Sequence, residues 1–255
     1  MARLTGKVVL CAGSATGIGA ATALRMGREG AHVVIGDLNK AGAQKVIDQI
    51  EAEGGRGLAA EFDIAEPASV KAMIDQTVAH FGGLDLMHVN ATDRRLNRQD
   101  FDAVSTELEV FDRVHTVSLR GHLLCTKYGI PEMLKRGGGA IVYTSSDASK
   151  LPDRVRMAYG VAKAGLNALM RHVAFRWGRE GIRANTITPG AILTEAMIGN
   201  TSDTERAAIL AKIPHTRSGT PEDIAALVSF LLSNEGEWIN GQAISINGGS
   251  VMGIG

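Results

Sequence analysis

The chain contains little that would indicate a secreted, membrane-bound or nucleic-acid-binding protein. Its only two cysteines, Cys11 and Cys125, are too few for a disulfide framework or a cysteine metal site. No apolar run approaches the ~20 residues that span a bilayer, and the N-terminal segment lacks the apolar core of a signal peptide. Lys plus Arg and Asp plus Glu number 27 each, so the net charge of zero supports neither nucleic acid nor an anionic membrane as a partner. These absences predict a soluble, cytoplasmic protein.

What is present is an alternation of short apolar runs with longer helical patterns. Val8–Leu10 and Val33–Ile35 are apolar throughout, as strands buried on both faces require. Strands that alternate with helices predict parallel crossover units, and therefore an α/β fold with helices on both faces of one sheet. The expected strands are Lys7–Ala12, His32–Asp37, Gly57–Phe62, Leu84–Asn90, Ala140–Ser145, Arg183–Thr188 and Ala243–Ile246. The expected helices are Gly17–Glu29, Ala41–Glu53, Ala68–Phe81, Leu108–Lys135, Met157–Arg179 and Glu222–Leu232.

The 255 residues show no linker, repeat or change in composition, so we expect one domain over residues 1–255. Thr194–Ser218 fits the alternation poorly and is expected to be a mobile excursion or lid. Ligands of open α/β sheets bind at the carboxyl ends of the strands. Chemically distinctive residues gather there: Gly13, Asp37, Asp63, Asn90, Ser146 and Pro189-Gly190 follow or end the first six strands.

A glycine-rich turn, Gly13-Ser14-Ala15-Thr16-Gly17-Ile18-Gly19, joins the first strand to the first helix. Its glycines allow a tight turn and the close approach of a pyrophosphate to the helix N-terminus, where free N–H groups attract anions. The spacing G-x-x-x-G-x-G is neither G-x-G-x-x-G nor a P-loop. A turn alone would also use glycine, but the position between strand and helix favours a ligand site.

Asp37 ends the second strand, 18 residues after Gly19. A carboxylate there can accept hydrogen bonds from both ribose hydroxyls of an adenosine and would repel a 2′-phosphate, which predicts NAD over NADP. No Arg or Lys occurs in Ser14–Ile18, and Leu38 follows the aspartate. The alternative is an aspartate that only caps a turn or helix.

Tyr159 and Lys163 are four residues apart on an expected helix and therefore lie on one face of it. A nearby ammonium favours the phenolate and lowers the pKa of the phenol, which suits proton transfer to or from an alcohol oxygen. Ser146, thirteen residues before Tyr159, can bind the same oxygen. An isolated pair of this kind is common on helix surfaces, and the serine and the glycine turn make the catalytic interpretation the stronger one.

These residues resemble the short-chain dehydrogenase/reductase family in its compact single-domain branch, over essentially the whole chain. The resemblance implies a doubly wound Rossmann-type parallel sheet of about seven strands. The motifs that carry it are Gly13…Gly17-Ile18-Gly19, Asp63-Ile64, Asn90-Ala91, Ser146, Tyr159, Lys163, Asn185…Pro189-Gly190, Thr194, Arg217–Asp223 and Ile246–Gly249.

The resemblance also implies roles for single residues. Tyr159 would be the general acid/base, Ser146 would polarise the substrate oxygen, and Lys163 would bind the nicotinamide ribose and lower the pKa of the tyrosine. Family members usually form homotetramers or homodimers by pairing the helices expected here at Leu108–Lys135 and Met157–Arg179. The expected cofactor contacts are Gly13, Ser14, Thr16, Gly17, Ile18, Gly19, Asp37, Leu38, Asp63, Ile64, Asn90, Ala91, Tyr159, Lys163, Pro189, Gly190, Ile192 and Thr194.

The chain departs from the family pattern at two positions. Thr92 stands where relatives have glycine, so either the turn avoids positive φ or the local backbone differs. Ser118 stands where relatives have an asparagine that holds a water in the proton relay behind the lysine. We expect the relay to persist through Ser118 and an additional water, and the alternative is weakened or re-routed proton transfer.

The substrate side is less informative. Arg94, Arg95, Arg154 and Arg156 flank the expected substrate mouth and lead to the hypothesis that one or more binds an anionic or polar substrate group, against the simpler interpretation of a solvated surface. His115 and His122 could share a helix face, but no other ligand joins them and we expect no metal site.

We therefore predict an NAD-dependent oxidoreductase that interconverts a small-molecule secondary alcohol and a ketone. One alternative is a weakly active or non-catalytic NAD(H)-binding module, suggested by Thr92 and Ser118. A second is an NADPH-dependent ketoreductase, which Asp37 disfavours.

Overall fold

The chain folds around one parallel sheet of seven strands, which confirms the doubly wound α/β class expected from the sequence. The computed structural model describes residues 2–93 and 95–252. The strand order is β3-β2-β1-β4-β5-β6-β7, so the chain winds outward in one direction from β1 and then in the other from β4. The strands are β1 (Val8–Ala12), β2 (His32–Asp37), β3 (Arg56–Glu61), β4 (Leu86–Val89), β5 (Gly139–Thr144), β6 (Ile182–Pro189) and β7 (Ala243–Ile246).

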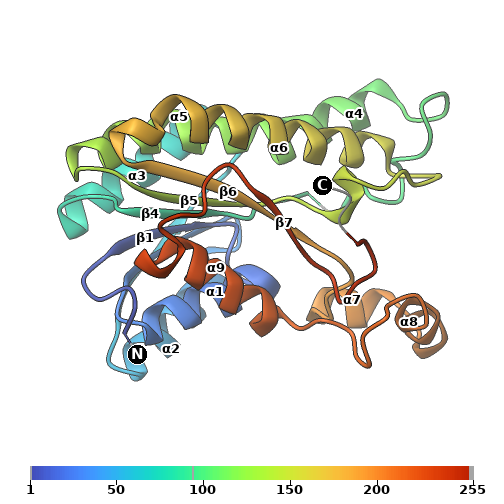
Figure 1. Cartoon of the computed structure of the whole chain (residues 1–255), viewed down its shortest axis with the longest axis horizontal. Coiled ribbons are helices and arrows are strands. Elements are labelled where there is room, and N and C mark those ends of the chain that lie inside the picture. Colours follow the sequence, from blue (N-terminus) through green and yellow to red (C-terminus); the bar gives the residue numbers. More distant parts are fainter. Residues whose placement is uncertain (1, 94, 253–255) are drawn as a thin grey trace.

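Helices cover both faces of the sheet, and each face has its own apolar core (Figure 1). The core on one face includes Leu166 and Met170 together with Met73 and Ile74. The core on the other face includes Met26. Burial on both faces explains why the central strands are apolar throughout. One face carries α3 (Pro67–Phe81), α5 (Gly121–Lys135) and α6 (Met157–Trp177), with α4 (Leu108–His115) against α6. The other carries α1 (Gly17–Arg28), α2 (Lys40–Ala52) and α9 (Pro221–Leu232).

Local capping chemistry explains several helix ends. Pro67 begins α3 at a position where a missing N–H costs nothing, and Gly82 ends it with φ 80°. Asn39 caps α2 by accepting a hydrogen bond from Gly42 N. Thr220 begins α9 with a capping box. Most expected boundaries therefore agree with the structure to within one or two residues, and β4 is shorter than expected because Asp85 and Asn90 only flank it.

The expected helical stretch Leu108–Lys135 is confirmed, but it is not α-helical throughout. The segment Thr116–Arg120 is a π-helical turn that separates α4 from α5. At its end Gly121 lies against Ile64, where a Cβ would be 2.8 Å from the Ile64 carbonyl oxygen. An apolar pattern with helical spacing cannot reveal such a wider turn, since it changes the backbone bonds and leaves the buried face continuous.

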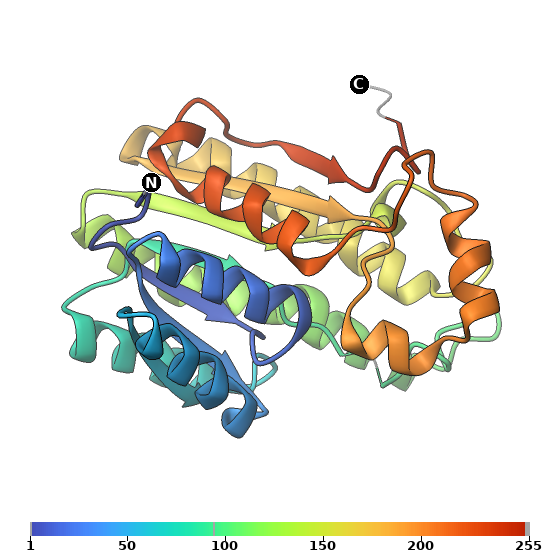
Figure 2. The same cartoon turned by 90° about the horizontal axis from the view of Figure 1, so that it is seen from below.

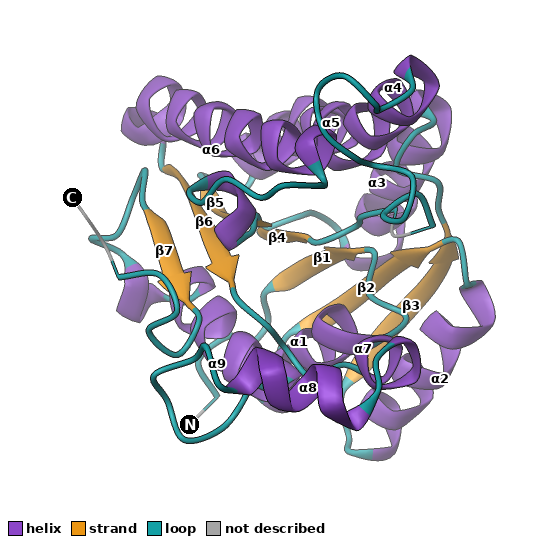
Figure 3. Ribbon diagram, turned by 90° about the vertical axis from the view of Figure 1, so that its right-hand side faces the viewer, coloured by secondary structure: helices purple, strands orange, loops and turns teal. Residues whose placement is uncertain are grey.

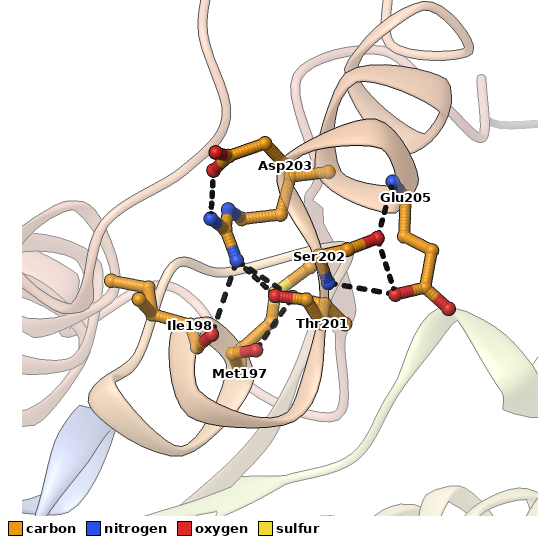
Figure 4. A network of polar contacts seen from close by, with 7 residues as sticks. Met197, Ile198, Thr201, Ser202, Asp203 and Glu205 are labelled. Atoms are coloured by element: carbon orange, nitrogen blue, oxygen red, sulfur yellow. Dashed lines mark hydrogen bonds and ion pairs between the residues drawn. The ribbon is translucent and has the colours of Figure 1, made fainter.

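The expected excursion at Thr194–Ser218 is largely helical, with α7 (Glu195–Asn200) and α8 (Asp203–Leu210). In Figure 2 these two helices lie beyond the carboxyl ends of the strands. The Arg206 guanidinium donates to the carbonyl oxygens of Ile198, at 3.1 Å, and of Thr201, and it pairs with Asp203 (Figure 4). A Ser202 capping box begins α8 at the same place. These bonds tie α7 and α8 into one small unit.

Three 3₁₀ turns and one isolated bridge complete the secondary structure of the described residues. Single 3₁₀ turns occur at Asp147–Ser149, Gly178–Glu180 and Asn234–Gly236, and the one bridge outside the named strands joins Ile192 to Gly219. Within residues 2–93 and 95–252 no helix has the length and apolar character needed to cross a bilayer.

Candidate active site

A cavity of ≈ 1080 Å³ opens at the carboxyl edge of the sheet, the edge that faces the viewer in Figure 3. The strand ends and the loops that follow them contribute much of its wall, and α1, α4, α6, α7 and α8 also contribute residues. This is where parallel α/β sheets bind ligands. Of the residues expected at the site, the following line the cavity: Gly13, Thr16, Gly17, Ile18, Asp37, Leu38, Asp63, Ile64, Asn90, Ala91, Ser146, Tyr159, Lys163, Pro189, Gly190, Ile192 and Thr194.

Three expected residues do not line it. Ser14 is fully buried beneath the glycine turn, and Gly19 faces it, since a Cβ on Gly19 would lie 2.5 Å from the Ser14 hydroxyl oxygen. Ser118 is buried in the π-helical turn. Ser14 and Gly19 therefore stabilise the turn by packing closely against each other.

The glycine turn presents an open helix N-terminus to the cavity. Thr16, the N-cap of α1, makes no side-chain capping bond, and the first turn of the helix has no acidic residue. Gly13 has φ 77°, and a Cβ there would lie 2.5 Å from Ala91 Cα, so only glycine fits. Asn90 fixes the turn from β4, since its Nδ2 donates to Gly13 O at 2.8 Å. The free N–H groups and the helix dipole suit a phosphate.

Asp37 holds the far side of the same turn. Its two carboxylate oxygens accept hydrogen bonds from Ala15 N and Asn39 N, each at 2.9 Å. The aspartate thus has the turn-capping role that was its alternative interpretation. It also lines the cavity beside Leu38, and each carboxylate oxygen retains acceptor capacity. Lys40 nearby is exposed.

Lys163 lies on α6 with its side chain fully enclosed. Its Nζ donates to the carbonyl oxygen of Thr144 at 2.7 Å and lies 5.6 Å from the centre of the Tyr159 ring. Burial lowers the pKa of the Lys163 ammonium to about 7, because a cation is poorly solvated there. The lysine can therefore gain or lose a proton near neutral pH, directly beside a phenol.

Ser146 follows β5 and begins the 3₁₀ turn Asp147–Ser149. Its hydroxyl accepts from Ala148 N at 3.2 Å, which fixes the oxygen at the cavity wall and leaves the hydroxyl hydrogen free to donate. The preceding Ser145 donates to Lys163 O at 3.1 Å and so joins the end of β5 to the helix that carries the lysine. Ser146, Tyr159 and Lys163 are thus brought to one wall of one cavity.

Two histidines lie in the core near Lys163. His88 Nε2 is 2.9 Å from Thr144 Oγ1, and His122 Nδ1 is 3.3 Å from Val117 O. Burial lowers the pKa of His88 to about 3, and burial followed by the charge of Lys163 lowers the pKa of His122. Both imidazoles are therefore neutral at physiological pH, and within the described residues no group of three His, Cys, Asp or Glu could hold a metal ion.

The two departures in the sequence lie together. Thr92 Oγ1 is 3.3 Å from Ser118 Oγ, so the threonine after β4 contacts the π-helical turn. Among the described non-glycine residues only Arg156 has a positive φ, so the φ of Thr92 is negative. The turn after β4 therefore takes an ordinary backbone conformation at Thr92.

Charged pairs also line the cavity. Arg95 makes a forked pair with Asp93, at 2.9 Å and 2.6 Å, and Arg113 Nε contacts the same carboxylate at 3.2 Å. The Arg95 hydrogen bonds, together with Arg113, lower the pKa of Asp93 to about 2. Arg156 also lines the cavity and pairs with Asp153, whereas Arg154 does not line it. Arg94 lies outside the described residues.

Sequence reasoning assigned no role to several charged residues at or beside the site, among them the following three. Arg113 lines the cavity from α4. Asp147 also lines it, accepts from Asn247 Nδ2 at 3.0 Å, and has a pKa raised by burial. Asp100 is buried beside Tyr159. Only the position of Asp147, next to Ser146, was a signal that the sequence itself contained.

Comparisons with known proteins find relatives over nearly the whole chain. A family model described as enoyl-(acyl carrier protein) reductase matches residues 12–251. A probable short-chain type dehydrogenase/reductase of Bradyrhizobium diazoefficiens is 39% identical, covering 98% of this chain and 89% of the relative. A cyclohexanol dehydrogenase of Acinetobacter is 34% identical, covering 96% and 95%.

Among solved structures, a 7α-hydroxysteroid dehydrogenase complexed with NADH and 7-oxo glycochenodeoxycholic acid superposes with a TM-score of 0.92. It is 31% identical, and the match covers 100% of this chain and 98% of the other. Sequence and fold both match over nearly the whole chain. The chain is an oxidoreductase of the short-chain dehydrogenase/reductase family.

Proposed function

We propose that this protein is an NAD(H)-dependent oxidoreductase that interconverts a secondary alcohol and a ketone, with Tyr159 as general acid/base. The observation that carries the proposal is the enclosed Lys163 ammonium beside the Tyr159 ring, in the same cavity as the glycine turn. A proton-transfer group near neutral pH and a phosphate-binding turn are both needed for this reaction. The cyclohexanol and hydroxysteroid dehydrogenases among the relatives support the same substrate chemistry.

The chain's own residues fit a nicotinamide dinucleotide. The open N-terminus of α1 and the glycine at residue 13 suit a pyrophosphate, and Asp37 and Leu38 line the end expected for the adenosine. Asp63, Ile64, Asn90 and Ala91 would lie along the cofactor, and Pro189, Gly190, Ile192 and Thr194 would lie at its nicotinamide end. The bound cofactor would accept or donate the hydride.

The protein residues then handle the proton. In the oxidative direction the phenolate of Tyr159 takes the hydroxyl proton of the alcohol, while the Ser146 hydroxyl donates a hydrogen bond to the same oxygen. Lys163 favours the phenolate by its charge and is fixed by Thr144 O. Thr92 lines the cavity and its hydroxyl contacts that of the buried Ser118, and we propose that the proton relay persists through them.

The preference for NAD rests on Asp37. Asp37 lines the cavity, and neither the turn at residues 14–18 nor Leu38 provides a cation that could bind a 2′-phosphate. This argues against the alternative of an NADPH-dependent ketoreductase. The other alternative, a non-catalytic NAD(H)-binding module, is disfavoured because Ser146, Tyr159 and Lys163 share one cavity wall.

A homotetramer or homodimer is the assembly that we propose. Exposed apolar side chains lie along the helices that family members pair: Leu108 on α4, Leu123 on α5, and Val161 and Phe175 on α6. Phe175 is 92% exposed, and an aromatic ring on a helix surface is typical of an interface. We also propose a cytoplasmic location, consistent with the unbridged Cys11 and Cys125. We further propose one domain over residues 1–255, with a substrate lid around residues 194–218 that includes α7 and α8.

For the substrate we propose that a guanidinium at the cavity mouth binds an anionic or polar group. Arg95 and Arg156 line the cavity and are exposed, each paired with only one carboxylate. Arg95→Ala and Arg156→Ala should raise KM for the true substrate, and Arg154→Ala, outside the cavity lining, is the matched control. An unchanged KM in both cavity variants would refute the idea.

The test of the function is a screen of secondary alcohols, from cyclohexanols to hydroxysteroids, with NAD and with NADP, followed by the absorbance of the reduced cofactor. We expect turnover of at least one alcohol with NAD and a lower kcat/KM with NADP. Binding of NADH without turnover of any alcohol or ketone would support the non-catalytic alternative.

A further inference from the structure

The helix that carries Tyr159 and Lys163 begins without a local cap. Its N-cap residue is Arg156, whose side chain makes no capping bond and whose backbone lies in the left-handed region, φ 62° and ψ 40°. Arginine is a poor N-cap and is rarely left-handed. The first N–H groups of a helix have no partner within it, so partners must come from elsewhere.

The partners are supplied by Asp100, 59 residues before Tyr159. One carboxylate oxygen of Asp100 accepts from Ala158 N and the other from Tyr159 N, both at 2.9 Å. Asp100 is 2% exposed, so these are charge-assisted bonds shielded from water. The backbone of the tyrosine itself is therefore held by a buried carboxylate from the loop between β4 and α4.

The main chain of the same loop satisfies the two preceding N–H groups. Arg156 N donates to Asp100 O at 2.7 Å, and Met157 N donates to Phe101 O at 3.1 Å. Four consecutive amides, from Arg156 to Tyr159, thus bond to two consecutive residues of a distant loop. The left-handed conformation of Arg156 is where the chain changes direction to enter this arrangement.

The loop is itself anchored against the helix. Asp100 N donates to Leu96 O at 3.1 Å, and Leu96 packs on an apolar cluster that includes Val110, Ala158 and Ala162. Phe101 N donates to the Thr106 hydroxyl at 2.9 Å. These contacts keep the Asp100 carboxylate in place independently of any ligand.

We propose that Asp100 is a positioning residue for the reaction, which clamps the main chain of Tyr159 and whose charge offsets the positive end of α6. The inference rests on the proposed function, in which Tyr159 transfers the proton. A phenol that must lie within hydrogen-bond distance of a substrate oxygen depends on the position of its backbone, and small displacements are costly to the rate. The clamp sets that position from a segment that also carries Asp93 and Arg95 at the cavity mouth.

The charge has a separate and measurable consequence. The N-terminus of a helix favours anions, and a carboxylate bound there reduces that effect on the phenolate. Removing the charge of Asp100 should therefore lower the pKa of Tyr159. The other charged groups near Tyr159 on the cavity wall stay unchanged in the variants: Lys163, Arg156, Asp153, Asp147, Arg113 and Asp93.

The variants are Asp100→Ala, which removes acceptors and charge, and Asp100→Asn, which keeps one acceptor and removes the charge. The matched control is Asp102→Asn, because Asp102 is exposed in the same loop and caps Val104 N at 2.8 Å without touching α6. We expect Asp100→Ala to lower kcat about 10- to 100-fold. The kcat of Asp100→Asn should lie between those of Asp100→Ala and the wild type, and the KM for NAD should be nearly unchanged in both variants. Asp102→Asn should behave as the wild type.

Ultraviolet titration of the tyrosinate supplies a readout that needs no activity. The chain has three tyrosines, and burial raises the pKa of Tyr143 far above its usual range. In a Tyr128→Phe background the first tyrosinate to form is that of Tyr159. Its midpoint should fall by about 0.5 pH unit in Asp100→Ala and Asp100→Asn and stay constant in Asp102→Asn.

The outcomes separate the two proposals. An Asp100→Asn protein with wild-type kcat and an unshifted tyrosinate midpoint would overturn the clamp, even if Asp100→Ala does not fold. An active Tyr159→Phe enzyme would instead overturn the proposed function, while the titration would still report on the clamp.

Discussion

Lys163 Nζ lies 5.6 Å from the centre of the Tyr159 ring and is held there by a 2.7 Å hydrogen bond to Thr144 O. The lysine is fully buried, and burial lowers its pKa to about 7. A buried cation reduces the stability of the fold, so the pair stores an energetic cost at the site. The cost can be measured as a change in the unfolding free energy with pH.

Lys163→Met should remove this cost and with it the activity. The unfolded chain binds the lysine proton up to pH ~10.4 and the folded protein only up to about 7, so the stability of the wild type rises with pH between these values. Relative to Lys163→Met, the wild type should gain roughly 2 kcal/mol in unfolding free energy from pH 7 to pH 9. Urea unfolding of both proteins at the two pH values measures the difference, and parallel curves would contradict the lowered pKa.

The buried His88 makes a similar prediction at acid pH. Burial lowers its pKa to about 3, so the unfolded state binds the proton first and stability falls as the pH drops below about 6.5. Between pH 6.5 and pH 4.5 the wild type should lose roughly 2 kcal/mol more than His88→Leu. Thermal or urea unfolding across this range tests it, with the exposed His80→Leu as the control.

Asp37→Asn should relax the choice of cofactor. The amide keeps an acceptor for Ala15 N or Asn39 N but loses the charge that repels a 2′-phosphate. We expect the ratio of kcat/KM for NAD over NADP to fall about tenfold or more, mainly through weaker NAD and stronger NADP binding. Asp48→Asn, an exposed aspartate on α2, should leave the ratio unchanged. An unaltered ratio in Asp37→Asn would remove this residue from the specificity argument.

Ser118→Ala tests whether the serine matters to the proton relay. The variant loses only the 3.3 Å contact with Thr92, and if the relay persists through water kcat should fall by less than about tenfold. The measurement is kcat against pH, with solvent isotope effects. A loss as deep as that of Tyr159→Phe would show that water cannot replace the Ser118 hydroxyl in the relay.

Much of the site was predictable because it depends on local patterns. Apolar runs locate β1 and β2, and a strand end in a parallel sheet determines which edge a following residue occupies. Asp37 and Ser146 could therefore be assigned to one edge without knowledge of side-chain positions. Helix spacing placed Tyr159 and Lys163 on one face in the same way.

The remainder depends on contacts between distant segments. The cap that Asp100 provides to Tyr159 spans 59 residues, and Arg156 at the helix start gives the opposite of a capping signal. The π-helical turn around Ser118 leaves the apolar pattern unbroken. Gly19 was assigned to the ligand but packs against Ser14, because glycine serves both purposes equally well.

The most direct test of the account is Tyr159→Phe, which removes one oxygen atom and keeps the ring beside Lys163. We predict that kcat falls to a few per cent of the wild-type value or less, while the Kd for NADH, measured by fluorescence titration, stays within about twofold. Retention of more than a few per cent of kcat, with NADH still bound, would contradict the assignment of Tyr159 as the acid/base.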